Sequence, residues 1–483
     1  MSSLYKKTSK NLIKLGASLL VTICFGAITK AVLPRILGVE NIGIIYFADS
    51  IAMITFSLLS LGVIAYVNRR IPHNPKEITE IYSSIFGFTF LWGLILWLGI
   101  FAYVLWRGEV SEKSLVILLI AVFHLLQSHN AGVVKPMFLA ADQVNFISRI
   151  NIISKGLQTA IICGGAFFIP SLVWVGVFFI CSELLTSLFL LIRSFRLGWV
   201  RFNFDRKMFF AAVAVGFPFL LNQTMVSIYG QIDIAFMEFL SNPKEIGWYG
   251  SAQKLKGLFL MGVPLIYSAI LPMLSRSYKE GTESYEKFLS TIFAGLLFMS
   301  FGMSLSMSLL SPELVGILFG DEFNISIKHV SMLAPVLLFT YINVLLGANL
   351  TLSSTGKLLN IVTITSIGMN ASLNLYFIPM GLEHFGPGGA GIGAATTTII
   401  AEAFVFIMMI LMTPVKLMNW KNAVFCLASY LALSATIFYQ VSSSPDLMVR
   451  LQLLGALVVI LSGAFALANG KDLLEFKNKL RKS

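Results

Sequence analysis

Long apolar runs joined by short turns restrict this 483-residue chain more than any other feature of its sequence. Crossing the hydrocarbon core of a bilayer takes about 20 apolar residues in a helix. Hydrophobic residues make up 57% of the chain and charged residues only 12%, whereas a soluble domain averages about 25% charged residues. The sequence therefore excludes a soluble globular protein and predicts an all-α polytopic membrane protein.

Fourteen apolar runs are long enough to be transmembrane helices. We place them at 11–33, 42–67, 83–105, 115–139, 147–169, 171–195, 208–239, 246–274, 288–311, 328–352, 358–380, 388–413, 421–440 and 449–469. The connecting loops are too short to hold a soluble catalytic domain. We therefore expect a protein that is not an enzyme and that binds no cofactor.

Lysine and arginine residues are distributed unevenly between alternate loops. Cytoplasmic loops of membrane proteins carry an excess of both. With the N-terminus inside, 25 of the 35 lysines and arginines fall in inside segments and six in outside segments, which predicts that both termini are cytoplasmic. The net charge of +12 does not indicate a nucleic-acid partner, because the basic residues are spread over many loops. The four cysteines lie in apolar runs without metal-site spacing, so we expect no metal.

The first six predicted spans resemble the next six. NIGIIYFADS at 41–50 aligns with EIGWYGSAQK at 245–254, and FFIP at 167–170 aligns with YFIP at 376–379. Copies with an even number of spans share one topology, so we expect two six-helix bundles related by a pseudo-two-fold axis along the membrane normal. The predicted domains are one bundle at 1–200, a second at 201–415, and two further helices with a basic cytoplasmic tail at 416–483.

Four segments carry a resemblance to a known family: RILGVENIGIIYFADSI (35–51), GFPFLLNQTMVSIYGQID (216–233), NASLNLYFIP (370–379) and GIGAATTTIIAE (391–402). On these segments the chain resembles the multidrug/oligosaccharidyl-lipid/polysaccharide exporter superfamily. Within it, the chain looks like the polysaccharide branch, the O-antigen type flippases of lipid-linked oligosaccharides. The resemblance implies two bundles that open alternately to each side of a bacterial cytoplasmic (inner) membrane.

The resemblance also implies a cargo. A flippase of this branch moves polyprenyl-pyrophosphate-linked oligosaccharide repeat units across the membrane for surface polysaccharide biosynthesis. Its partners are the lipid-linked oligosaccharide and membrane lipids, and the resemblance admits a polysaccharide polymerase and glycosyltransferases beside them. The alternatives are a cation-coupled multidrug antiporter of the same superfamily, which typically has an acidic residue where this chain has Lys30, and an integral-membrane polysaccharide polymerase or ligase.

Ionisable and polar residues inside the predicted spans are the candidate site residues. A charge at the bilayer centre costs about 2.5–3.5 kcal/mol on insertion scales, a diphosphate needs fixed counter-charge, and sugar hydroxyls need mixed donors and acceptors. We expect the substrate cavity to be lined from both halves of the chain by Lys30, Arg35, Asp49, His124, Gln127, Lys155, Asp233, Lys254 and Lys256. We expect Glu183 and its repeat counterpart Glu402 to be ion-coupling sites, because burial brings carboxyl protonation toward neutral pH.

Several of these residues also have a structural interpretation. Lys30 can extend to the outer interface, or it can pair with Asp49 as a gate or a permanent clamp. Lys155 and Glu183 can form a buried ion pair. His124, which shares a helix face with Gln127, can make a polar contact between helices.

The two lysines of the eighth span point about 200° apart, because they are two residues apart on a helix. Lys254 shares a face with small residues and Lys256 shares a face with polar ones. We therefore favour Lys256 for the cavity.

Overall fold

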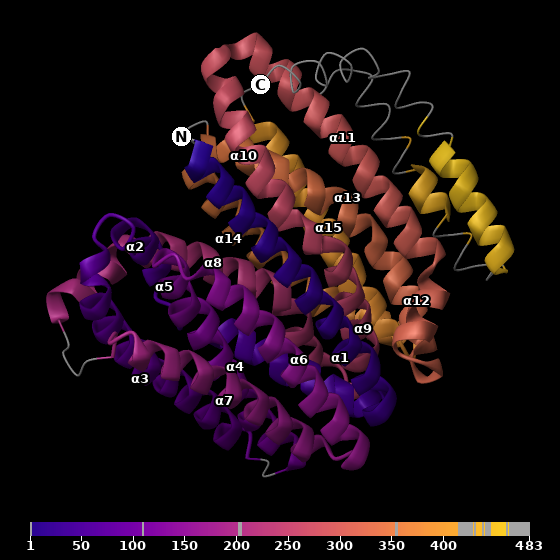
Figure 1. The fold of residues 1–483 in the computed structure, drawn as a ribbon. Coiled ribbons are helices and arrows are strands. Elements are labelled where there is room, and N and C mark those ends of the chain that lie inside the picture. The colour runs from indigo at the N-terminus through magenta and orange to yellow at the C-terminus, as the bar shows by residue number, and fades with distance from the viewer. Residues whose placement is uncertain are drawn as a thin grey trace. The chain divides into compact units, whose positions relative to one another are not determined.

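The computed structural model describes residues 2–108, 111–200, 205–352, 356–413 and 446–459, together with 428, 431–436, 439 and 462. The described residues are almost entirely helical and contain no strand. The α-helices are α1 (Ser2–Phe56), α2 (Val63–Arg70), α3 (Ile78–Trp106), α4 (Glu112–His129), α5 (Lys135–Ala140), α6 (Val144–Phe168), α7 (Leu172–Arg196), α8 (Arg206–Leu240), α9 (Pro243–Phe259), α10 (Val263–Glu280), α11 (Thr282–Leu309), α12 (Ser311–Leu318), α13 (Asn324–Leu352), α14 (Gly356–Phe385) and α15 (Gly389–Met412). Short helical turns are η1 (Pro75–Glu77), η2 (Asn130–Val134), η3 (Leu260–Gly262) and η4 (Asp321–Phe323). Figure 1 shows their arrangement.

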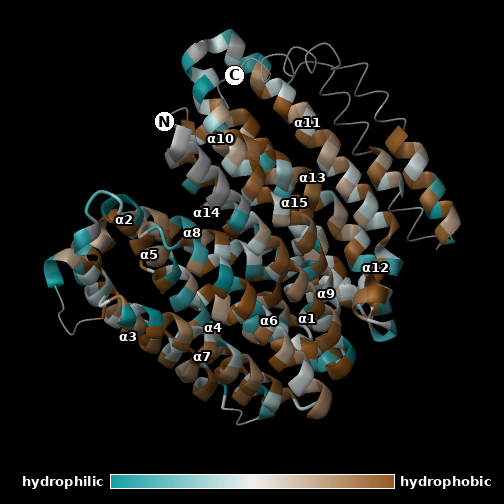
Figure 2. Cartoon of the chain, in the orientation of Figure 1, coloured by the Kyte–Doolittle hydropathy of each residue, from teal (hydrophilic) through white to brown (hydrophobic). Residues whose placement is uncertain are grey.

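The described helices include eleven stretches that are long and apolar enough to cross a membrane. The first twelve predicted spans each overlap one of these eleven stretches, and the first two overlap the same stretch, Lys14–Phe56. Hydrophobic residues dominate the helices, and hydrophilic residues gather on turns such as those around α2 and α12 (Figure 2). The predicted all-α polytopic fold is therefore confirmed. The last two predicted spans and the basic tail lie mostly outside the described residues.

The first helical stretch has two breaks, of which the first falls in the predicted connection 34–41 and the second departs from the prediction. Pro34 lies inside the helix, and the kink falls at Gly38, whose φ of 76° is in the left-handed region that favours glycine. The predicted span 42–67 is too long, because α1 ends at Phe56 and a turn with positive φ at Leu61 and Gly62 precedes α2. Local hydropathy is high across that turn, which is why composition alone extends the span through it.

Two other predicted spans are single membrane stretches with an irregular turn inside. The span 115–139 is built from α4, the π-helical turn η2 and α5. The span 246–274 is built from α9, the 3₁₀ turn η3 and α10, with Pro264 in the first turn of α10. Isolated π turns inside α-helices are frequent at functional sites, and η2 borders the cavity described below.

The chain divides into two compact units, Met1–Glu238 and Phe239–Ser483. In the first unit, α1 and α7 each pack against both α4 and α6. In the second unit, a buried apolar cluster is built mainly from α10, α11 and α13, with α13 also packed against α15. The predicted domain division at 200 and 415 stays a prediction.

Helix α8 has several contacts with earlier parts of the first unit. The Ser50 hydroxyl donates a hydrogen bond of 3.0 Å to the carbonyl oxygen of Gln231. The backbones of Gly62 and Gly216 approach so closely that a Cβ added to Gly62 would lie 2.0 Å from the Gly216 carbonyl oxygen. Glu238 accepts from Arg107 at 2.6 Å and from Lys113 at 2.5 Å. These contacts explain why the boundary between the units falls at the end of α8.

Candidate functional site

A polar cavity of about 260 Å³ lies within the first unit, among the helices that pack around α4. Two lysines and one glutamate line it together with amide and hydroxyl side chains. The lining residues are Thr22, Gln127, Ala131, Lys135, Asn151, Ser154, Lys155, Gln158, Glu183 and Thr186. Three predicted site residues, Gln127, Lys155 and Glu183, are thus brought together from three different helices.

Two of the three charged groups of this cavity have neutral hydrogen-bond partners. The Lys155 ammonium donates to the Gln158 side-chain oxygen at 2.5 Å, and the Glu183 carboxylate accepts from the Asn130 amide at 2.7 Å. Lys155 and Glu183 interact electrostatically across the cavity, but they form no direct ion pair in the described structure. The described structure therefore does not contain the buried Lys155–Glu183 ion pair that the sequence admits.

Lys135 is the charged lining residue that sequence reasoning missed. It lies near the end of the predicted span 115–139, is absent from the predicted site residues, and lines the cavity beside Gln127 and Ala131. These three residues are spaced by four, and the wider turn of the π-helical segment η2 keeps that spacing on one face. The sequence signal for this part of the cavity is the polar patch from His124 to Asn130. The patch indicates an irregular stretch, but it does not indicate which face of the helix Lys135 shares.

His124 lies one turn before Gln127 on α4 and makes a hydrogen-bonding contact with α1. Its Nε2 atom is 2.6 Å from Asp49 Oδ1. The His124 side chain is buried and the Asp49 side chain is 24% exposed. The sequence offers Asp49 as one partner for Lys30, and the structure shows a contact between Asp49 and His124.

The second unit repeats one element of this site. Asn343 of α13 donates to the Glu402 carboxylate of α15 at 3.0 Å, and Thr340 donates to the same oxygen at 3.4 Å. Asn130 and Glu183 make the corresponding bond in the first unit. In each unit the asparagine comes from the fourth span of the predicted repeat and the glutamate from the sixth.

The other predicted site residues are placed as follows. Lys30, Lys254 and Lys256 are half-buried within helices, Asp233 is buried in α8, and Arg35 is exposed near the kink of α1. Lys254 and Lys256 fall in the same burial class, so the structure gives no preference for Lys256. In the described part of the chain, no group of three or more histidine, cysteine, aspartate or glutamate residues is placed to hold a metal ion.

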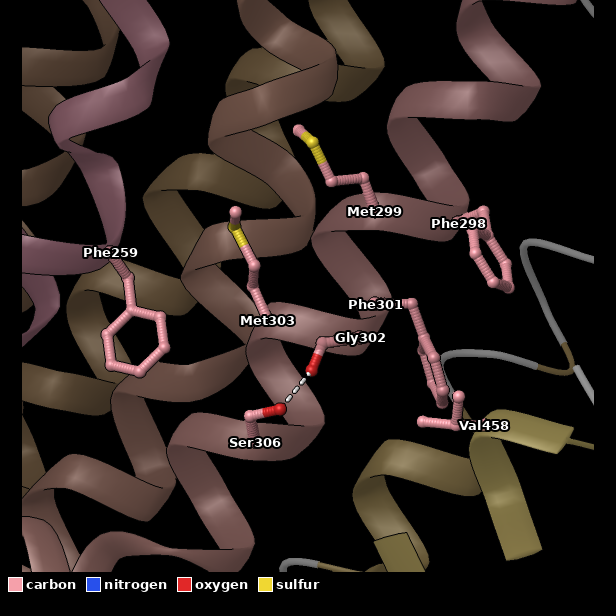
Figure 3. A pocket seen from close by; sticks show the side chains of 8 residues that line it. All are labelled: Phe259, Phe298, Met299, Phe301, Gly302, Met303, Ser306 and Val458. Atoms are coloured by element: carbon pink, nitrogen blue, oxygen red, sulfur yellow. Dashed lines mark hydrogen bonds between the residues drawn. The ribbon is translucent and has the colours of Figure 1, made fainter. Parts of the chain in front are cut away.

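A second cavity, of about 280 Å³, lies in the second unit and is apolar. Its lining is shown in Figure 3: Phe259, Phe298, Met299, Phe301, Gly302, Met303, Ser306 and Val458. Its one hydroxyl, on Ser306, donates to the Gly302 carbonyl of its own helix at 2.8 Å. The described lining of this cavity therefore offers no charged group to a polar ligand.

Comparison with known proteins places these features in a family. Residues 8–278 match the sequence model of a family described as polysaccharide biosynthesis protein. The chain is 24% identical over 168 residues to the probable low-salt glycan biosynthesis flippase Agl15 of Haloferax volcanii. That match spans 35% of this chain and 35% of the relative.

Solved structures share the fold over nearly the whole chain. The lipid II flippase MurJ in an inward closed conformation matches with a TM-score of 0.71 and 15% identity, over 96% of this chain and all of that one. An inward-facing multidrug resistance transporter of the MATE family matches with a TM-score of 0.62 and 15% identity, over 90% of this chain and 99% of that one. At this identity the likeness shows the fold and leaves the cargo to be argued from the site.

Proposed function

This chain belongs to the polysaccharide biosynthesis protein family, as its sequence predicts, and from that premise we propose that it is a flippase for polyprenyl-pyrophosphate-linked oligosaccharides. The observation that carries the proposal is the cavity of the first unit, where Lys135 and Lys155 lie among amides and hydroxyls with one carboxylate. Two ammonium groups supply counter-charge for a diphosphate. The surrounding amides and hydroxyls supply the donors and acceptors that sugar hydroxyls bind.

The proposed activity of this protein is transport. We propose a multi-pass protein of the bacterial inner membrane with both termini in the cytoplasm. In this proposal the cavity opens alternately to each side of the membrane. Lys30, Arg35, Asp233, Lys254 and Lys256 add to the cargo path in this proposal. Glycosyltransferases that build the repeat unit and a polymerase that consumes it are the proposed partners.

The paired asparagine–glutamate contacts support a role in ion coupling. Glu183 and Glu402 are both buried, and each accepts a hydrogen bond from an asparagine amide. A protonated carboxyl can keep that bond through its carbonyl oxygen, so each site can gain or lose a proton without losing its partner. We propose that these two glutamates are the coupling sites, one in each unit.

Substitution of the cavity lysines tests the cargo. A hydrogen bond to a charged group contributes about 1.5–3 kcal/mol, so Lys155→Gln and Lys135→Gln should each weaken diphosphate binding about 10- to 150-fold. Binding of a short-chain polyprenyl diphosphate to the purified protein measures this directly, and surface polysaccharide in a deletion strain measures transport. Lys76→Gln, at an exposed position on a turn, is the matched control.

A cation-coupled multidrug antiporter of the same fold predicts the opposite pattern. Cationic drugs would be repelled by Lys135 and Lys155, so their removal would raise drug transport. Unchanged diphosphate binding and unchanged surface polysaccharide in both variants, together with altered drug resistance, would refute the flippase proposal.

A further inference from the structure

The contact between His124 and Asp49 joins α4 to α1 directly beside the polar cavity. The 2.6 Å separation between His124 Nε2 and Asp49 Oδ1 is that of a strong, charge-assisted hydrogen bond. His124 precedes the cavity-lining residues Gln127 and Ala131 by three and seven positions, so all three lie on one side of the α4–η2 segment. The pair is therefore placed where its charge acts on a ligand in the cavity.

The pair also interacts with the charged residues of the cavity. Glu183 interacts electrostatically with Lys135, Lys155 and His124, and Lys155 interacts electrostatically with Asp49. Among the helices packed against α4, α1 presents Asp49 and α7 presents Glu183. The charged residue of α3 is Glu80, which lies in its first turn.

The second histidine of α4 has a different environment. His129 is buried, bonds through Nε2 to the carbonyl oxygen of Phe86 at 3.1 Å, and packs edge-on against the rings of Phe86 and Phe90. It faces no carboxylate in these contacts. His124, which faces Asp49, is the histidine whose charged form has a partner.

From these contacts we propose that His124 and Asp49 form a proton-binding pair whose protonation strengthens the binding of an anionic diphosphate in the cavity. With Nε2–H donating to Asp49, the proton adds to the Nδ1 lone pair of neutral His124, comes from water, and breaks no other bond. Histidine is the side chain whose ordinary titration falls near physiological pH. The inference rests on the proposed function and adds to it a protonation site and the direction in which pH changes cargo affinity.

The summed charge near the cavity gives the direction in which protonation of His124 changes diphosphate affinity. With both lysines charged and both carboxylates ionised, the set Lys135, Lys155, Glu183, Asp49 and neutral His124 sums to zero. Protonation of His124 raises this summed charge to +1, which favours binding of a diphosphate. By linkage, cargo binding favours protonation by the same factor, and such coupling factors are commonly about 5- to 150-fold.

The test compares probe binding at two pH values. Farnesyl diphosphate is the probe, and its Kd is measured for the full-length protein in nanodiscs at pH 6 and pH 8. His124→Gln keeps an amide donor toward Asp49 but cannot gain a charge. His73→Gln, which changes an exposed histidine outside the spans, is the matched control. Comparison with the control cancels the titration of the probe's own phosphate.

We expect affinity to rise toward pH 6 at least about 5-fold more in the His73→Gln control than in His124→Gln. Asp49→Asn should raise affinity at pH 8, because it removes a negative charge from the set. A pH indicator in weak buffer should register proton uptake on probe addition in the control and less uptake in His124→Gln.

Each outcome has one meaning. Equal pH slopes and equal proton uptake in His124→Gln and the control would overturn the proton-binding pair while leaving the flippase proposal in place. Probe binding that survives the loss of both cavity lysines would overturn the cargo assignment, and the linkage with it. Thermal unfolding of each variant checks that it is folded, and Asp49→Asn provides an independent reading if His124→Gln is unstable.

Discussion

Glu238 is a buried carboxylate that accepts from two cations, and its removal should destabilise the first unit measurably. Its side chain is 2% exposed, and one oxygen accepts from both Arg107 and Lys113, whose side chains are 29% and 23% exposed. The hydrogen bond from Arg107 to Glu238 raises the pKa of the Arg107 guanidinium above its ordinary value. Lys113 also lies 5.7 Å above the Phe47 ring. Glu238→Ala therefore leaves two cations without their shared anion at the end of α8.

The expected cost follows from burial. Breaking a buried ion pair costs about 3–5 kcal/mol, and because both cations are partly exposed and regain water, we reduce this to about 2–3 kcal/mol. For a unit of this size, 1 kcal/mol corresponds to a Tm shift of about 2–4 °C. Glu238→Ala should thus lower the Tm of the first unit by about 4–12 °C. Glu238→Gln keeps one acceptor and should cost less.

Thermal unfolding in detergent at a fixed scan rate measures the shift. Glu112→Gln changes an exposed acid close to Lys113 in the sequence and should alter the free energy of unfolding by less than about 0.5 kcal/mol. A double-mutant cycle between Glu238→Gln and Lys113→Met isolates the pair from the packing of each side chain. A Tm for Glu238→Ala within about 1 °C of the wild type would refute the reasoning, since it would mean that the contacts exert no net stabilisation.

Three further outcomes test packing, a buried hydrogen bond and topology. Gly393→Ala should abolish the yield of folded protein in size-exclusion chromatography, because the new Cβ would lie 2.0 Å from the Phe377 carbonyl oxygen, whereas Gly295→Ala, with nothing within 4 Å, should be neutral or slightly stabilising. Tyr285→Phe loses a buried 2.5 Å hydrogen bond to an asparagine oxygen and should lower stability by about 1–2 kcal/mol in denaturant unfolding. Ser111→Cys, in a variant without native cysteines, should react with a membrane-impermeant maleimide in intact cells, and labelling only after permeabilisation would contradict the cytoplasmic placement of the termini.

The sequence by itself determined the membrane class and most of the membrane-spanning helices. Burial of an uninterrupted apolar run in lipid depends on local composition, because a helix satisfies all its backbone hydrogen bonds within itself. For that reason twelve of the predicted spans overlap observed apolar stretches. The same logic identified Lys155 and Glu183, because a charge inside an apolar run is visible without knowing its neighbours.

The tertiary structure decided which of these residues meet. Rotation of each helix and the choice of partner depend on packing between segments far apart in the chain, which hydropathy does not encode. Thus Asp49 contacts His124, Glu183 contacts Asn130, and Lys135 enters the cavity because the π-helical turn keeps it on the face of Gln127. Charge within the membrane can be read residue by residue, but a binding site requires several helices to present their polar faces to one volume.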